Sequence, residues 1–471
     1  MRFPLALTAK IARHIVKHKV LRTPKFALVL QLEPLHTCNL TCTGCGRIRE
    51  YSTSLKDMMP LEDCLASAAE CDAPMVSICG GEPLIYPKIE ELVNGILAQG
   101  RIVYICTNGM FMRKKMRDYL ASIYNTGLEP KLASLLAEKL ITAKEADEIR
   151  KGKKDGRDVI KPSRWQYWNV HIDGLEYTHD LIVEREGVFK ECVEAIKMAK
   201  ALGYQVATNT TVYKETDVKE LEQMFEFFSS MEVDGHTISP GYEYDAAKKD
   251  MVKRLGKQPE DFFLTRKMTR EKFAKIQEWG ERFTIFGTPV YQEFLAGKRE
   301  LTCTAWAIPT RNVKGWKAPC YLMTDGHYPK YQEMLDKVDW NKYGVVDGVA
   351  RDPRCENCMV HCGYDPSGAL ATSPSDTWKN LKYNFGAKPK PYHEGRTVNA
   401  FNGTSIGKGH LAEAKAAINS PRAAMNGAQS VFSRREEPHN HAGDSAGGSC
   451  GTGDTTQRDE LLAKITPKKD V

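Results

Sequence analysis

The stretch FALVLQLEPLHTCNLTCTGCGR, residues 26–47, joins an apolar run to three closely spaced cysteines. Its first part, FALVLQLEP (26–34), is typical of a buried strand, which delivers the chain to Cys38, Cys42 and Cys45. A structural zinc ion or a fully ligated iron–sulfur cluster takes four protein ligands. Three thiols therefore predict a metal centre with one position left open for chemistry.

The same strand pattern recurs along the chain. Further strands are expected at 73–83, 101–109, 167–174, 204–213 and 233–242, with helices between them at 61–71, 87–99, 187–202 and 217–231. Strand–helix alternation with short links predicts parallel strands joined by right-handed crossovers. We therefore expect an α/β fold with a curved sheet or partial barrel, whose functional groups lie at the carboxyl ends of the strands.

The composition excludes several classes of protein. The 471 residues are 42% hydrophobic and 27% charged, as in a globular protein, and 14 of them are cysteine. We find no secretory signal pattern ahead of the tight cysteine clusters, so we expect metal-bound thiolates in the reduced cytoplasm rather than disulfides. Apolar runs of about 18 residues, as a membrane span requires, are missing.

The first residues are basic and amphipathic. Residues 1–26 contain seven Lys or Arg and no acid, within a net charge of +7, and we expect a helix over 1–25. Such a helix can lie on an anionic membrane surface, here the inner face of the cytoplasmic membrane, or it can dock on the protein with a solvated basic face. Nucleic acid is not an expected partner, because basic stretches with interleaved aromatic residues do not recur.

Further segments interrupt or follow the core that we place at 26–290. Residues 124–165 are a charged insertion, expected to form two short surface helices. Residues 291–377 are a cysteine-bearing C-terminal domain with few strand signals, and the composition of 378–471 predicts a disordered tail.

The cysteine spacing matches a [4Fe–4S] cluster whose fourth iron binds a small molecule. A zinc site would need a fourth ligand, which His36 could supply. The second strand ends in Gly80-Gly81-Glu82-Pro83. The glycines allow close approach of the backbone to a ligand, and Glu82 can accept a hydrogen bond from an ammonium group.

With its three-cysteine motif and GGEP, the chain resembles the radical S-adenosylmethionine (radical SAM) superfamily. The resemblance implies a partial (β/α)6 barrel over about residues 26–290. It also implies that the methionine end of S-adenosylmethionine binds the fourth iron and that Gly80, Gly81 and Glu82 hold its amino group. Cleavage of the cofactor then gives a 5′-deoxyadenosyl radical. Superfamily members usually carry an aromatic residue just before the third cysteine, where this chain has Gly44.

The match extends to one family of that superfamily. The chain is similar to the adenosyl-hopene transferases of hopanoid biosynthesis over about residues 1–370, without the insertion; the stretches that carry the likeness are EPLHTCNLTCTGCGRI, CDAPMVSICGGEPL, YICTNG, VHIDG, SPGYEY, TCTAWAIPTRNVKGWKAPCYL and CENCMVHCGYD. This implies addition of the radical to the terminal alkene of hopene (diploptene) to give adenosylhopane. It further implies a flavodoxin- or ferredoxin-type reductant and a membrane surface as partners.

Such an addition leaves a tertiary carbon radical, which a thiol can quench because its S–H bond is weak. Cys106 ends the third strand, where it is expected to face the barrel mouth. A free cysteine is otherwise usually a small buried hydrophobic residue. Cys79, just before GGEP, is the alternative donor.

Other strand ends carry polar residues that the superfamily resemblance assigns to cofactor contacts: Asn108, His171, Asp173 and Asn209. Asp173-Gly174 could equally be turn chemistry. Tyr242 and Tyr244 could shape an apolar substrate pocket.

A second group of cysteines lies in the C-terminal region: Cys303, Cys320, Cys355, Cys358 and Cys362. It resembles the extensions that bind auxiliary iron–sulfur clusters in related enzymes, and zinc held by four of the sulfurs is the alternative. His361 is a further possible ligand.

Two rival functions remain open. The chain could be a radical enzyme that matures a peptide or protein, or a zinc-stabilised binding protein without turnover.

Overall fold

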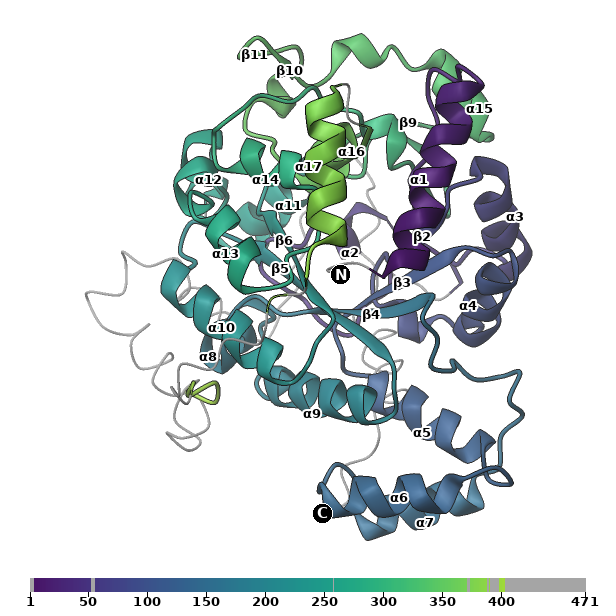
Figure 1. Cartoon of the computed structure of the whole chain (residues 1–471). Coiled ribbons are helices and arrows are strands. Elements are labelled where there is room, and N and C mark those ends of the chain that lie inside the picture. The colour runs from purple at the N-terminus through teal and green to yellow at the C-terminus, as the bar shows by residue number, and fades with distance from the viewer. Residues whose placement is uncertain are drawn as a thin grey trace, which may run out of the picture.

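The computed structural model describes residues 4–51, 56–256, 258–370, 373–387, 389 and 398–402. Its centre is an open, mostly parallel sheet with helices outside it (Figure 1). Six parallel strands follow one another in chain order: β1 (Val29–Leu32), β2 (Met75–Ile78), β3 (Ile102–Thr107), β4 (Gln166–His171), β5 (Gln205–Val212) and β6 (Gly235–Pro240). This arrangement confirms the predicted α/β partial barrel.

Helices connect these strands. They are α3 (Leu61–Cys71), α4 (Ile89–Ala98), α5 (Met112–Ser122), α8 (Glu176–Ile182), α9 (Val188–Ala201) and α10 (Val218–Ser230). Alternation along each strand divides the sheet into two faces. Residues such as Ile105, Trp168 and Val170 are buried in the main core, where the helices cover the sheet. The opposite face bears Ser77, Cys106 and Asn169 near the carboxyl ends of their strands.

Helix α1 (Leu5–Val20) packs against the amino-terminal end of that second face. Leu7 is fully buried in a cluster with Ile102, Tyr104 and Tyr167, and the two tyrosine rings stack with centroids 4.9 Å apart. Ile11 lies against the same cluster. One side of the amphipathic helix is therefore a docking surface, as the second sequence-based interpretation expects.

The insertion contains the two expected helices, α6 (Leu128–Ala137) and α7 (Ala143–Lys151), which lie as a pair below the barrel in Figure 1. A capping box starts α7: the Thr142 side chain accepts from the backbone of Glu145, whose carboxylate accepts from the backbone of Thr142. Glu145 also pairs with Arg113 and Arg117 of α5, which attaches the insertion to the barrel.

The cysteine-bearing region adds strands that the sequence did not reveal. β7 (Thr310–Asn312) pairs in parallel with β1, and β8 (Gly315–Pro319) and β9 (Thr324–Tyr328) continue the sheet antiparallel. The sequence carries few signals for these strands because they are short and contain Gly, Pro and polar residues. A two-residue ladder, β10 (Val345–Val346) and β11 (Val349–Ala350), follows.

The remaining helices surround the strands on the C-terminal side: α2 (Arg47–Glu50), α11 (Asp245–Asp250), α12 (Arg266–Lys272), α13 (Ile276–Arg282), α14 (Pro289–Leu295), α15 (Tyr331–Lys337), α16 (His361–Leu370) and α17 (Pro374–Phe385). Within the part of the chain that the structure describes, no helix is both long and apolar enough to span a bilayer.

The start of the predicted disordered tail needs correction, because residues 378–385 belong to α17. Ser373 caps this helix and Pro374 occupies its first turn, which favours a helix start. The Tyr383 hydroxyl donates to the Ile285 carbonyl at 2.7 Å, so the helix is bound to the barrel wall. Residues 403–471 lie outside the described residues.

Candidate active site

Cys38, Cys42 and Cys45 lie in the loop between β1 and α2, as the sequence predicts. The loop is fastened to the end of α8: the Thr43 amide donates to the Ile182 carbonyl at 2.8 Å, and its hydroxyl donates to Glu184 at 3.0 Å. Arg254 donates to the same carboxylate and to the Thr41 carbonyl. The cysteines are therefore carried on a backbone held from two sides.

The three thiols are close enough to influence one another. Burial raises the pKa of Cys42 well above its usual value, and the neighbouring Cys45 and Cys38 raise it further. A metal that binds thiolates relieves this crowding of like charges, because it neutralises them. The donor set therefore fits a cluster held by three cysteines.

The structure does not bring the sulfurs of Cys38, Cys42 and Cys45 to the distance that they would have from one another on a zinc ion. With Zn–S bonds of about 2.3 Å, tetrahedral zinc brings its sulfurs to about 3.8 Å from each other. Among the described residues, no three cysteine sulfurs lie within 4.8 Å of one another. The His36 ring nitrogen Nε2 lies 3.3 Å from Glu33, while its Nδ1 is buried without a hydrogen-bond partner and stays available as a ligand.

Gly80 and Gly81 approach the cysteine loop itself. A Cβ on Gly80 would lie 2.2 Å from the Leu35 carbonyl oxygen, and one on Gly81 would lie 2.1 Å from that of Thr37. The Gly81 amide donates to the Leu35 carbonyl at 3.1 Å. The absence of side chains thus lets the end of β2 pair with the loop, whereas the sequence indicated only an approach to a ligand.

Glu82 is buried and holds together the ends of β2 and β3. Its carboxylate accepts from the Leu84 amide at 3.0 Å, the Thr107 hydroxyl at 2.8 Å and the Asn108 amide at 2.8 Å. Burial raises the pKa of Glu82 to about 7, while the backbone donors oppose that rise. Three donors from the protein already engage this carboxylate, so it positions the site even without a bound ammonium group.

Asn108 connects this network to the cysteine loop. Its side-chain amide donates to the Asn39 side chain at 2.8 Å and lies 3.8 Å from the sulfur of Cys38. The structure therefore brings Glu82, Asn108 and the first cysteine into one contiguous group, as the sequence expects of a cofactor site.

Asp173 and Asn209 lie on neighbouring strand ends. Asp173 is fully buried, accepts from the Thr211 amide at 2.7 Å and lies 2.9 Å from the His171 ring. Burial lowers the pKa of His171, but the charge and hydrogen bond of Asp173 raise it by more, so the net shift is upward. In the register of β4 and β5, His171 pairs with Asn209. The negative charge of Asp173 also raises the pKa of Cys42, so Asp173 lies near the cysteine loop.

Aromatic side chains from distant segments surround Gly44, and the sequence analysis missed them. Gly44 has a φ of +78°, and a Cβ there would lie 2.5 Å from the Phe262 ring. That ring stacks on Tyr213, with centroids 4.2 Å apart. The space that an aromatic side chain at position 44 would fill is thus occupied by Phe262, more than two hundred residues later in the chain. The sequence around Gly44 gives no signal for this contact.

Tyr244 and Tyr242 point to different sites. The Tyr244 hydroxyl accepts from the Gly46 amide at 2.7 Å, beside the cysteine loop. Tyr242 lines the pocket of the C-terminal cysteines. A role of both tyrosines in shaping a substrate pocket stays a prediction.

Cys106 lies on the inner face of the sheet. Its sulfur is 3.2 Å from the Ser77 hydroxyl of β2, and the Asn169 side chain of β4 donates to it at 3.4 Å. Burial raises the pKa of Cys106, so the group stays a protonated thiol at neutral pH. Cys79 is also buried, with a pKa raised well above the usual value by burial and then by Glu33.

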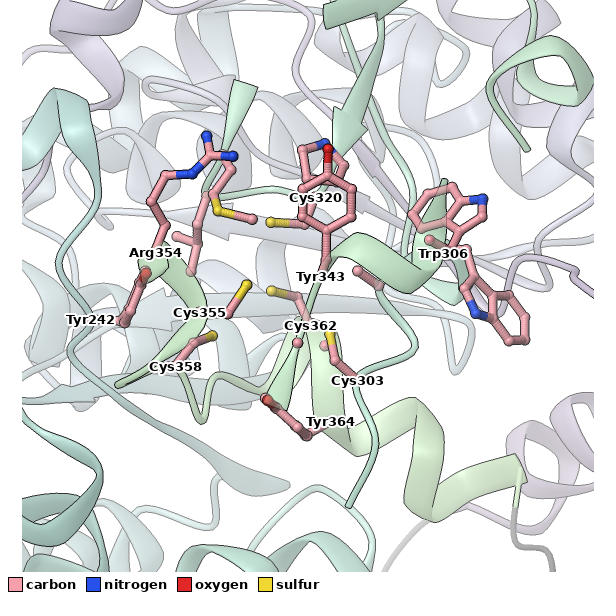
Figure 2. A pocket seen from close by; sticks show the side chains of 17 residues that line it. Tyr242, Cys303, Trp306, Cys320, Tyr343, Arg354, Cys355, Cys358, Cys362 and Tyr364 are labelled. Carbon is pink, nitrogen blue, oxygen red and sulfur yellow. The ribbon is translucent and has the colours of Figure 1, made fainter. Parts of the chain in front are cut away.

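The five C-terminal cysteines line one pocket together with aromatic residues (Figure 2). Its lining includes Tyr242, Trp306, Tyr343, Tyr364 and Arg354. His361 is not part of that lining; its Nδ1 lies 3.0 Å from the Ser239 hydroxyl of β6. The structure thus gathers the predicted cysteines and places the histidine elsewhere.

Two family models match parts of the chain. Residues 32–141 match the radical SAM superfamily, and residues 236–382 match a domain of unknown function, DUF3463. A 7-carboxy-7-deazaguanine synthase of Neisseria meningitidis is 31% identical over 116 residues, 25% of this chain and 50% of the synthase. A GTP 3′,8-cyclase of Aquifex aeolicus is 22% identical over 293 residues, 59% of this chain and 79% of the cyclase.

Among solved structures, Streptococcus suis SuiB bound to S-adenosylmethionine gives a TM-score of 0.42 at 14% identity, covering 64% of this chain and 62% of SuiB. The chain matches only half the length of the synthase, and the superfamily match covers the segment that holds the three cysteines and GGEP. This segment, with its thiol donor set, places the chain in the radical SAM superfamily, whose members use a [4Fe–4S] cluster and S-adenosylmethionine.

Proposed function

We propose that the protein adds the 5′-deoxyadenosyl group to the terminal alkene of hopene, giving adenosylhopane. The observation that carries this proposal is the environment of Cys106. Its protonated thiol contacts Ser77 and Asn169 on the inner face of the sheet, near the carboxyl ends of the strands where the cofactor would bind. The motifs shared with the adenosyl-hopene transferases are the reason for proposing hopene as the substrate.

The cluster at Cys38, Cys42 and Cys45, with S-adenosylmethionine, supplies an adenosyl carbon radical when both are bound. Gly80 and Gly81 bring the end of β2 against the cysteine loop, and Glu82 and Asn108 hold the adjoining strand end. On the neighbouring strand ends, the buried Asp173 holds the His171 ring, and His171 and Asn209, which pair in the β4–β5 register, would offer polar partners to a ribose or carboxylate.

Cys106 acts after the carbon–carbon bond has formed. Addition to a 1,1-disubstituted alkene leaves a tertiary radical on the lipid, and a hydrogen atom from the Cys106 S–H group completes the product. The cysteine sulfur is left one electron and one proton short, and a flavodoxin- or ferredoxin-type reductant with a proton from water restores it. A reaction that only abstracts hydrogen from its substrate has no such need for a thiol.

Ser77 and Asn169 decide which way the thiol faces. Asn169 donates to the sulfur, so the S–H hydrogen is directed away from that side. A donor fixed in this way delivers hydrogen to one face of the lipid radical, as positioned groups do elsewhere in catalysis.

The outer side of α1 supports a location at the inner face of the cytoplasmic membrane. Val16, Val20 and Leu21 are 58%, 74% and 64% exposed, among Arg13, Lys17, Lys19 and Arg22. Apolar residues flanked by cations are typical of helices that rest on anionic lipid. The inner side of the same helix docks on the barrel, so both expected roles are compatible.

Product analysis tests the proposal. The anaerobically reconstituted full chain, given S-adenosylmethionine, dithionite and hopene, should yield adenosylhopane by mass spectrometry. Cofactor cleavage without a lipid adduct would overturn the proposed substrate. Modification of a peptide substrate instead would establish the rival function, and failure to cleave the cofactor at all would leave only a binding protein.

A further inference from the structure

Three side chains that can bind a metal converge outside the active site, where α1 and α3 lie side by side (Figure 1). His14 and His18 are four residues apart on α1, and Asp72 caps the C-terminal end of α3. One donor atom of each lies within 4.8 Å of the other two, and no other group of three His, Cys, Asp or Glu does so among the residues that the structure describes. We propose that these side chains bind a divalent metal ion of intermediate softness, such as Zn²⁺, which clamps α1 onto the barrel.

The donor set determines which metals fit. Two imidazoles favour zinc and its neighbours over calcium or magnesium, which prefer oxygen ligands. Two histidines and one carboxylate are a known ligand set for zinc, with water in the fourth position. Zn–N and Zn–O bonds of about 2.0–2.2 Å hold the donors of a tetrahedron about 3.4 Å apart. Histidines four residues apart lie on one face of a helix, so small side-chain rotations complete this geometry.

His14 is held in the form that a metal requires. Its Nε2 donates to the Ala27 carbonyl at 2.9 Å, so Nε2 carries the proton and Nδ1 keeps its lone pair. Metal-binding histidines commonly donate their second ring nitrogen to a carbonyl in this way. Burial lowers the pKa of both His14 and His18, so both rings are neutral at pH 7, as ligands must be.

The His18 ring is fixed in place, but its nitrogens are not satisfied. The ring stacks on Phe26 with centroids 4.3 Å apart, and the His14 ring packs edge-on against it at 4.5 Å. Both nitrogens of His18 are buried without a hydrogen-bond partner. Buried polar atoms without a partner are costly, and a metal ion bound by one of these nitrogens would remove part of that cost.

The ends of two helices make the place favourable for a cation. His18 lies in the last turn of α1 and Asp72 caps α3, and the C-terminal ends of helices carry partial negative charge. In the structure, Lys17 lies 3.1 Å and Arg101 lies 3.4 Å from the Asp72 carboxylate. The Lys17 side chain is 54% exposed, so it can turn into solvent and leave one carboxylate oxygen to the metal. Lys17 is therefore a competitor of the metal ion.

A metal at this place would act on the docking of α1. Apolar contacts of Leu7 and Ile11 hold the first half of the helix on the barrel. His14 and His18 lie in its second half, and Asp72 belongs to a barrel helix. An ion that binds all three ligands stabilises the docked helix over the undocked one, because only the docked state brings the ligands together. The exposed apolar side of α1 then keeps a fixed orientation relative to the barrel.

Zinc uptake tests the site directly. The full chain is first reconstituted anaerobically with iron and sulfide, so that its clustered cysteines are occupied, and is then dialysed against micromolar Zn²⁺. By elemental mass spectrometry, the variant His14→Gln/His18→Gln should bind about one zinc ion fewer than the unaltered chain. The matched control is His439→Gln/His441→Gln, the other closely spaced pair of histidines, which should keep the full uptake.

Amide hydrogen exchange tests the clamp. Zn²⁺ at ten times its Kd should slow exchange across α1 about tenfold in the unaltered chain. Asp72→Asn should abolish this effect without disturbing the fold, because Asn tolerates the left-handed backbone at φ +51° but is a poor zinc ligand. Lys17→Gln should tighten zinc binding more than Lys19→Gln, which removes the same charge from the same helix away from Asp72.

Two results would overturn the inference. One is equal zinc uptake by the unaltered chain and by His14→Gln/His18→Gln. The other is an equal slowing of α1 exchange by Zn²⁺ in the unaltered chain and in Asp72→Asn. The proposed hopene reaction can fail independently, because neither measurement uses S-adenosylmethionine or lipid.

Discussion

Cys106 and Gly44 each depend on side chains that lie far from them in the sequence. Cys106 of β3 takes its orientation from Ser77 and Asn169 on the two adjacent strands. Gly44 leaves space for Phe262, which packs against the cysteine loop from beyond β6. At both positions the surroundings, rather than the residue type alone, determine the chemistry.

Replacing Cys106 with Ala should preserve cofactor cleavage and carbon–carbon bond formation but remove the hydrogen donor. The ratio of the two side-chain epimers, measured by chromatography, should change from a single epimer toward ~1:1, because solvent or reductant then quenches either face. Cys64→Ala, in the core of α3, is the control. The same single epimer at an unchanged rate would make Cys79 the next candidate.

Replacing Gly44 with Ala should destabilise the cysteine loop. A φ of +78° costs an L-residue about 1–2 kcal/mol, and the new Cβ would meet Phe262 at 2.5 Å. We expect a larger loss in the free energy of unfolding, measured in urea, and less bound iron. Gly203→Ala isolates the backbone cost, since φ is +86° there with no atom within 4 Å. Equal losses in the two variants would show that Phe262 exerts no steric effect.

At the scale of elements, one side of α1 packs on the barrel and the other side is exposed. Leu7 and Ile11 cover the tyrosines at the lower end of β3 and β4, while Val16, Val20 and Leu21 face outward. Removing the whole helix would therefore disturb the barrel and membrane binding at once. Substitutions on the outer side separate the two effects.

The triple variant Val16→Ser/Val20→Ser/Leu21→Ser should bind vesicles containing anionic phospholipid at least ~10-fold more weakly, because each apolar side chain contributes roughly 1–3 kcal/mol when buried in lipid. Its thermal midpoint should stay the same. Val252→Ser/Val349→Ser, which alters exposed valines elsewhere, is the matched control in a vesicle sedimentation assay. Unchanged binding by the triple variant would reduce α1 to a docking helix.

At the scale of the whole molecule, buried imidazoles couple stability to pH. Burial lowers the pKa of His14, His179, His236 and His361, to about 3 for His236 and about 4 for His361. In the unfolded chain these rings protonate near pH 6.5, before the folded chain does. The stability that these neutral buried rings contribute is therefore fully present above pH 6.5, and it is lost as the pH falls toward the pKa values of the folded chain.

His236 isolates this effect, because it lies between the Thr208 and Ser229 hydroxyls, in the core between sheet and helices. Between pH 7 and pH 5 its protonation in the unfolded state should remove about 2 kcal/mol of stability. His236→Gln should show a flatter dependence of the urea midpoint on pH. The same slope in both proteins would contradict a neutral buried His236.

The sequence predicted the sheet because strand patterns rich in β-branched and aromatic residues alternate with helical patterns, and a cysteine or polar residue follows several of the strands. Cys38, Glu82, Asn108 and Asp173 were found in this way, since parallel strands bring their carboxyl ends together. Phe262 and the pairing of β7 with β1 were not found. Both depend on contacts between distant segments, and β7 is too short to show a period in its own sequence.

The docking of α1 has a consequence for the order in which the chain is made. Leu7 and Ile11 leave the ribosome before Tyr104 and Tyr167, and well before Phe286, which packs against the same cluster. At synthesis rates of about 5–20 residues per second, the helix waits on the order of ten seconds or more for its full set of partners. During that interval both of its apolar sides are uncovered and its cations are free to meet anionic lipid. A nascent chain could thus be brought to a membrane before its barrel closes, and the folded enzyme would then be assembled beside the lipid it is proposed to modify.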